Sequence, residues 1–170
     1  MTSLLHHFAP NATWHDGPCA EVRVGDHAIR YMRRGTGPSI VVVSDDGDSH
    51  PMWRRLVESL APNHRIFLTQ PPPAGVDTPS WLRGFIEGIG LASIILIAGG
   101  AAAPAAMEVA AADDFTVRKL ILLPIDGPAP STEYDAWPAD APENFLALTA
   151  SSAEESLSRI ERFIAMDDAT

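Results

Sequence analysis

The densest group of side chains that could do chemistry lies between residues 44 and 50. It combines hydroxyls, carboxylates and an imidazole in the order Ser44-Asp45-Asp46-Gly47-Asp48-Ser49-His50. Carboxylate oxygens and an imidazole nitrogen are ligands for divalent metals, but this spacing matches no established metal-binding loop. We therefore expect no metal and no cofactor. A solvated loop in which Asp48 and Ser49 help to cap a following helix is the simpler interpretation.

Ser44, His50 and Asp126 are also the residue types of a nucleophile, a base and an acid. Asp45 and Asp46 stand beside Ser44 and would repel the negative charge that develops on an oxyanion. For Asp126, a turn-forming role before a glycine is the simpler interpretation. We therefore treat Ser44, Asp45, Asp46, His50 and Asp126 as a candidate pocket, without assigning a catalytic residue.

Composition narrows the classes of function. Against 12 basic residues the chain has 22 acidic ones, a formal net charge of -10, so a nucleic-acid backbone would be repelled. The single cysteine, Cys19, excludes an internal disulfide framework. The longest apolar stretch, Leu91 to Met107, is interrupted by glycines and a proline, and no signal-peptide pattern opens the chain. We expect a cytoplasmic protein without membrane insertion.

Two kinds of strand pattern follow one another along the chain. Residues 21–31 alternate apolar and polar side chains around Gly25-Asp26, which predicts a hairpin with one exposed face. Short continuous apolar runs at 39–43, 93–97 and 119–123 are typical of parallel strands covered on both faces. The more mixed runs at 65–69 and 144–149 suit strands nearer an edge of the sheet.

Four helices are predicted between these strands. Apolar side chains recur at helical spacing after Pro51, after Thr78-Pro79, and after a cap at Ser151 or Ser152. In the second of these, Thr78 is the expected capping residue and Gly90 the end. An alanine-rich helix over 101–112 follows Gly99-Gly100 and has Pro104 in its first turn.

This alternation predicts an α/β fold: a doubly wound, mostly parallel sheet with an N-terminal antiparallel hairpin. We assign residues 21–170 to this domain and residues 1–20 to an N-terminal arm. The arm carries apolar side chains that need a covering surface, on this domain or on another subunit: Leu4, Leu5, Phe8 and Trp14.

The order of features resembles that of the α/β-hydrolases. Arg33-Arg34-Gly35-Thr36-Gly37-Pro38 leads into the strand at 39–43, and Leu60-Ala61-Pro62 followed by His64-Arg65-Ile66 is similar to the family's turn into its next strand. The resemblance covers Glu21 to Pro124 and, more loosely, 144–164. It implies a truncated hydrolase-like core, with too few residues between Leu123 and Asn144 for a helical lid.

The resemblance also shows which parts of the family's chemistry are missing. Its nucleophile elbow, GxSxG, falls on Ala98-Gly99-Gly100-Ala101-Ala102, so Gly100 stands at the nucleophile position of a vestigial elbow. No Ser, Cys or Asp lies between Ser93 and Asp113, and all six histidines precede the elbow. The acidic run at 44–50 occupies the region where the family stabilises an oxyanion.

Two functions remain open. The first is a non-catalytic accessory or structural subunit of a larger assembly, which binds a protein partner or a second copy of itself through the arm or the sheet edge. The second is a small enzyme or small-molecule binder that uses Asp45, Asp46 and His50 at the ends of the strands.

Overall fold

The computed structural model describes residues 19–44, 51–112, 116–123, 144–148 and 152–166. Within these ranges the strands form one seven-stranded sheet in the order β1-β2-β4-β3-β5-β6-β7. The strands are β1 (Cys19–Val24), β2 (His27–Arg34), β3 (Ser39–Ser44), β4 (Arg65–Thr69), β5 (Ile94–Gly99), β6 (Val117–Leu123) and β7 (Phe145–Ala147). The predicted α/β class is confirmed: the sheet is mostly parallel, and its first two strands form an antiparallel hairpin.

The hairpin turns where the alternating pattern predicts it. Gly25 adopts a φ of +57°, a left-handed conformation that favours glycine, and Val24 pairs with His27 across the turn. β2 then pairs antiparallel with β4, which places the hairpin on one side of the parallel strands.

The position of β4 corrects one expectation. Its mixed composition predicts a strand near an edge, but β4 lies between β2 and β3, and Ile66 to Thr69 are buried. The hairpin covers what would otherwise be its open side. The other edge prediction is confirmed: β7 is the last strand of the described sheet and pairs only with β6 there.

The helices begin and end close to the predicted positions. They are α1 (Pro51–Leu60), α2 (Thr78–Gly88), α3 (Ala103–Ala112) and α4 (Ala153–Ala165), with a short 3₁₀ helix, η1 (Gly100–Ala102), before α3. Ser152 caps α4 by accepting a hydrogen bond from the N–H of Glu155 at 3.2 Å. The predicted cap of α2 is wrong: Asp77, not Thr78, accepts from the N–H of Ser80. A carboxylate suits this place better because it also interacts favourably with the positive end of the helix.

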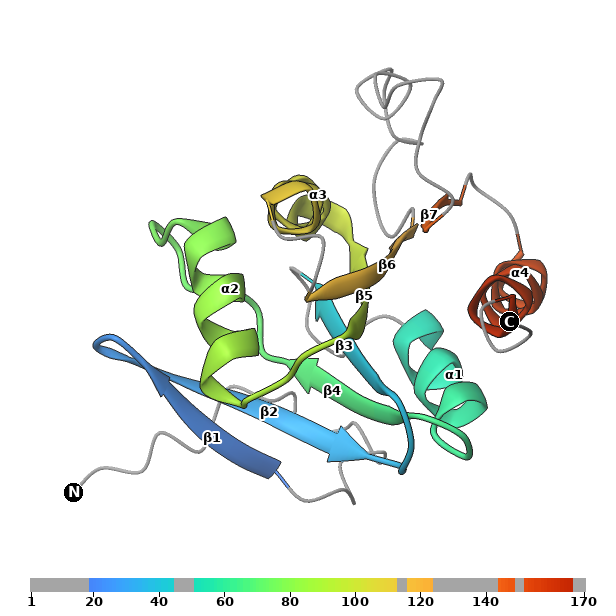
Figure 1. Ribbon diagram of the computed structural model, residues 1–170, viewed down its shortest axis with the longest axis horizontal. Coiled ribbons are helices and arrows are strands. Elements are labelled where there is room, and N and C mark those ends of the chain that lie inside the picture. The colour runs from blue at the N-terminus through green and yellow to red at the C-terminus, as the bar shows by residue number, and fades with distance from the viewer. Residues whose placement is uncertain (1–18, 45–50, 113–115, 124–143, 149–151, 167–170) are drawn as a thin grey trace.

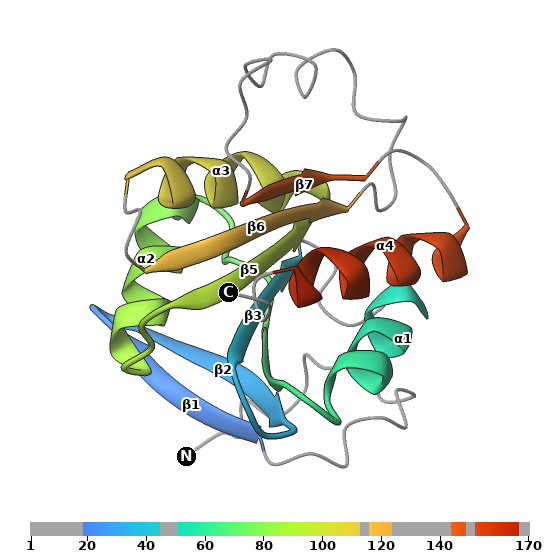
Figure 2. The same cartoon turned by 45° about the vertical axis from the view of Figure 1, so that its right-hand side comes forward.

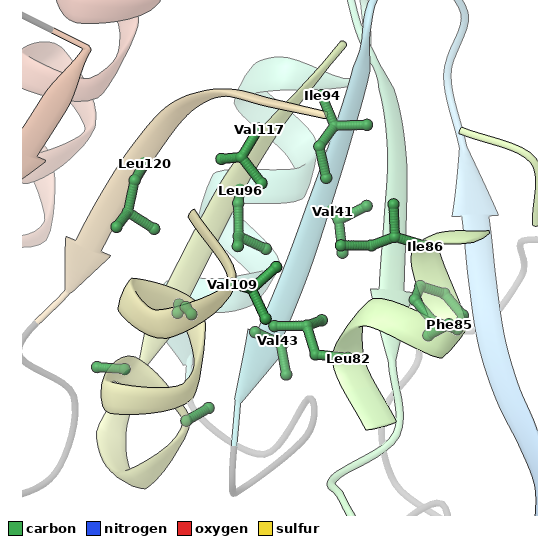
Figure 3. Close-up of a cluster of buried hydrophobic side chains, with 14 of the residues drawn as sticks. Val41, Val43, Leu82, Phe85, Ile86, Ile94, Leu96, Val109, Val117 and Leu120 are labelled. Carbon is green, nitrogen blue, oxygen red and sulfur yellow. The ribbon is translucent and has the colours of Figure 1, made fainter. Parts of the chain in front are cut away.

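The helices cover both faces of the sheet (Figures 1 and 2). α1 and α4 pack on one face over Ile40, Val42 and Ile97, and the second face is covered by α2 and α3. Figure 3 shows the second core, where Leu82 and Ile86 of α2 meet the side chains of β3 and β5. Strands buried on both faces need apolar side chains at consecutive positions, which is why the sequences of β3 and β5 are continuous apolar runs.

None of the helices in the described ranges is both long and apolar enough to cross a membrane.

Candidate functional site

The parallel strands place their carboxyl ends along one edge of the sheet. β3 ends at Ser44, β4 at Thr69 and β5 at Gly99, and Ser44 pairs with Gly99 in the β3–β5 ladder. In open α/β sheets this edge is where ligands bind, because loops and helix N-termini converge there. The candidate site is therefore built from what these three ends present.

The end of β5 presents a sharp turn without a side chain. Gly99 is still extended, with φ −142° and ψ 160°, and Gly100 then takes a φ of +61° as the chain enters η1. This left-handed conformation at a strand-to-helix turn is the backbone feature that would expose an attacking atom. Gly100 has only hydrogen there, and the turn is followed by alanines at positions 101–103.

The hydroxyl at the end of β3 already makes a hydrogen bond within the core. Ser44 is fully buried, and its Oγ accepts a hydrogen bond of 3.1 Å from Nε1 of Trp53 in α1. Trp53 is fully buried in the core between the sheet and α1. Ser44 therefore satisfies the indole N–H of a core tryptophan.

The remaining predicted site residues are outside the described ranges. Asp45, Asp46 and His50 follow β3 directly, and Asp126 follows β6, but neither segment is described. The same is true of the predicted partner-binding residues Leu4, Leu5, Phe8 and Trp14. Of the predicted pocket and elbow, the structure thus brings together Ser44, Gly99 and Gly100.

Two buried polar atoms, one at the end of β4 and one in α2, were not singled out in the sequence analysis. Thr69 is 1% exposed and Trp81, in the first turn of α2, is 2% exposed. Neither Oγ1 of Thr69 nor Nε1 of Trp81 has a hydrogen-bond partner. A threonine at the end of a strand and a tryptophan on the apolar stripe of a helix are ordinary core residues in a sequence, so no signal distinguishes them.

No known family model matches this sequence, and no curated protein matches it either. Solved structures do match. A proposed α/β hydrolase from Nostoc sp. PCC 7120 superposes with a TM-score of 0.56 at 19% identity, over 74% of this chain and 48% of its own. A proposed lipase from Acinetobacter baumannii AYE gives 0.56 at 19% identity, over 64% and 42%. A loop variant of a haloalkane dehalogenase from Bradyrhizobium elkanii gives 0.55 at 20%, over 67% and 42%.

These matches concern the fold. At such identities the chain shares with them an α/β-hydrolase-like architecture, as the resemblance in the sequence predicts. The matched region spans less than half the length of each of those proteins. What the chain does with this fold depends on its own residues.

Proposed function

We propose that this α/β-hydrolase-like chain does not catalyse acyl transfer, and that it acts as an accessory or structural subunit of a larger protein assembly. Gly100 carries this proposal. It occupies the left-handed turn after β5 with a φ of +61°, yet it has no atom that can attack a carbonyl carbon. The fold thus keeps the backbone of an elbow without its reactive group.

The neighbouring residues do not replace the missing nucleophile. From Ile94 to Ala112 the only ionisable side chain is Glu108, which is exposed on α3. Ser44, the closest hydroxyl by strand register, is buried and hydrogen-bonded to Trp53. A buried serine whose hydroxyl is bonded to a core indole lacks the exposure that an attacking hydroxyl needs.

The accessory role is supported by surfaces that suit association. β7 has three residues and pairs only with β6 among the described strands, and Phe145 and Leu146 are only half-buried on its two faces. An edge strand presents backbone N–H and C=O groups with which another chain can pair, and half-buried apolar side chains beside them offer surface to bury. The arm, with Leu4, Leu5, Phe8 and Trp14, is the second proposed docking element.

The first experiment tests the absence of acyl transfer. Purified chain is incubated with p-nitrophenyl acetate and with triacetin, beside Ser44→Ala and Gly100→Ala variants. We expect no turnover above the buffer rate in any of them. Turnover by the wild-type chain that either substitution abolishes would refute the proposal.

The second experiment tests the accessory role. Tagged full-length chain is expressed in its native host, and its assembly is measured by size exclusion with light scattering and by quantitative mass spectrometry. We expect a stoichiometric complex that is lost when Leu4, Leu5, Phe8 and Trp14 are replaced by alanine. Replacing His6 and His7 by alanine is the matched control, since it changes the same arm without removing apolar surface. A monomer without a stoichiometric partner would refute the accessory role.

A further inference from the structure

β1 is an edge strand of the described sheet. Among the described strands it pairs only with β2, and Figures 1 and 2 show no described element beside its other edge. It has six residues, against three in β7 at the opposite edge. A strand in this position presents a row of backbone N–H and C=O groups, and native proteins either protect such an edge or pair it with another strand.

The register of the hairpin shows which residues of β1 present these groups. In an antiparallel ladder, pairs of residues that exchange hydrogen bonds alternate with pairs that do not. The backbone oxygen of Arg30 accepts from the N–H of Gln70, so it is directed toward the β4 side and not toward Glu21, its partner in β1. The N–H and C=O of Glu21 therefore point away from β2, in the plane of the sheet. Those of Cys19 and Arg23, two residues away in each direction, do the same.

The side chains of Glu21 and Arg23 carry opposite charges on the same face of β1. Both residues are exposed. Glu21 lies 3.7 Å from Arg30 of β2, whereas Arg23 stands opposite Ala28 and has no ion-pair partner among the described residues. Charged side chains on an edge usually oppose pairing with another chain. Two opposite charges spaced two residues apart have the reverse effect when the incoming strand has the same sequence and runs antiparallel.

A two-fold axis at Val22 makes β1 complementary to itself. Antiparallel pairing about this axis sets Glu21 opposite the partner's Arg23 and, by symmetry, Arg23 opposite the partner's Glu21. Both pairs exchange backbone hydrogen bonds, because these residues present the outward groups, and opposite charges in directly facing pairs stabilise a sheet. An axis at Glu21 or at Arg23 would place like charges opposite each other, which is destabilising. The charges therefore select one register.

The other face of β1 gains apolar burial in the same register. Val22 and Val24 are half-buried against α2, with Cγ2 of Val22 beside Gly88. Val22 lies opposite the partner's Val22 in a pair without hydrogen bonds, the kind in which side chains approach most closely. Val24 lies opposite the partner's Ala20. The pairing thus covers apolar side chains that α2 leaves partly exposed.

We propose that two copies of this chain pair through β1 in antiparallel orientation, with the two-fold axis at Val22, so that their sheets become one continuous sheet. The interface is isologous, because each copy contributes the same strand and the same two charges. It lies at the edge opposite β7. This dimer goes beyond the proposed accessory role and does not rest on it, since the purified chain alone should form it.

Charge reversal tests the register. Glu21→Arg makes both facing positions basic and Arg23→Glu makes both acidic, so each variant alone should dimerise less well. The purified full-length chain is studied by sedimentation equilibrium at physiological ionic strength, with circular dichroism as a check of folding. We expect a dimer for the wild type and a dissociation constant at least about 10-fold weaker for each variant. Arg33→Glu, an exposed charge reversal on β2, is the matched control and should leave the dimer intact.

Mixing the two variants separates lost complementarity from lost folding. In an equimolar mixture, each basic position of Glu21→Arg meets an acidic position of Arg23→Glu. The mixture should therefore form a heterodimer that is tighter than the self-association of either variant. A mixture that associates no better than its components would contradict the proposed register.

A disulfide locates the two-fold axis. Cys19→Ser/Val22→Cys places the only thiol of each chain on the axis, where the two Cα atoms of the pair lie about 4.5 Å apart, within reach of an S–S bond. Oxidation with diamide should link the two copies. Cys19→Ser/Val24→Cys is the matched control, because it faces the partner's Ala20 and should link far less.

Three results would overturn the proposal: a monomeric wild type, a dimer that both charge reversals leave unchanged, or equal cross-linking at positions 22 and 24. A chain that is monomeric when purified but joins a stoichiometric complex in its host would overturn the dimer and leave the accessory role standing.

Discussion

Nζ of Lys119 donates a hydrogen bond of 2.5 Å to the backbone oxygen of Phe163, in the last turn of α4. A second bond of 3.2 Å reaches the oxygen of Ile164, and the ammonium lies 4.8 Å from the centroid of the Phe163 ring. Lys119 is 2% exposed and is the only lysine in the sequence. Its positive charge thus meets the negative end of α4, where backbone carbonyls have no partner within the helix.

Lys119→Met tests whether this contact holds α4 on the sheet. The variant keeps the length of the side chain but loses the donors, so we expect the free energy of unfolding to fall by about 1–3 kcal/mol. Hydrogen exchange should speed up in α4 more than in α1, which packs on the same face without this contact. Equal protection of both helices, with unchanged stability, would contradict the proposed role.

The bond between Ser44 and Trp53 supports a second prediction. Ser44→Ala leaves the indole N–H of Trp53 buried and unpaired, which should cost about 1–3 kcal/mol of stability in chemical denaturation. In a double-mutant cycle, adding Trp53→Phe should cost less in the Ser44→Ala background than in the wild type. Strictly additive effects would show that the two side chains are not coupled.

A third prediction concerns the turn after β5. At a φ of +61°, any side chain at Gly100 is strained, so Gly100→Ala and Gly100→Ser should each lose about 1–2 kcal/mol of stability. We expect Gly100→Ser to show no more p-nitrophenyl acetate hydrolysis than Gly100→Ala, because a hydroxyl without a base is a weak nucleophile. A clear rate advantage of the serine variant would reveal a base near the turn.

Features that depend on residues close together in the sequence could be predicted from the sequence. The apolar runs of β3 and β5 reflect burial on both faces, the cap at Ser152 reflects a local hydrogen bond, and Gly100 falls at the left-handed turn that its glycine suggests. Each of these signals is set by residues within a few positions of one another.

Features that depend on contacts between distant parts of the chain could not be predicted from the sequence. β4 is interior because β2, far from it in sequence, pairs with its outer side. Lys119 caps a helix whose last turn lies more than forty residues later. Thr69 and Trp81 stand out only because their buried polar atoms have no hydrogen-bond partner. This can be recognised only when the positions of all neighbouring residues are known.

The last prediction concerns the close packing of α2 on the hairpin. Gly84 and Gly88 face β1, and a Cβ on Gly84 would lie 2.3 Å from Cγ1 of Val24. On an exposed helix face, Gly→Ala raises stability by about 1 kcal/mol because it removes backbone entropy from the unfolded chain. Here the new methyl group overlaps a β-branched side chain with few rotamers, and such overpacking costs about 1–3 kcal/mol.

We therefore expect Gly84→Ala to lower the free energy of unfolding by about 1–2 kcal/mol in urea, with the overlap outweighing the helix propensity. Val24→Ala is the matched control, and the double variant should be more stable than Gly84→Ala because removing Cγ1 makes room for the new methyl group. Gly88→Ala should be milder, since its nearest contact, Cγ2 of Val22, is 2.9 Å away. If Gly84→Ala alone stabilises the protein, α2 and β1 are not in close contact, and the glycines serve the helix in some other way.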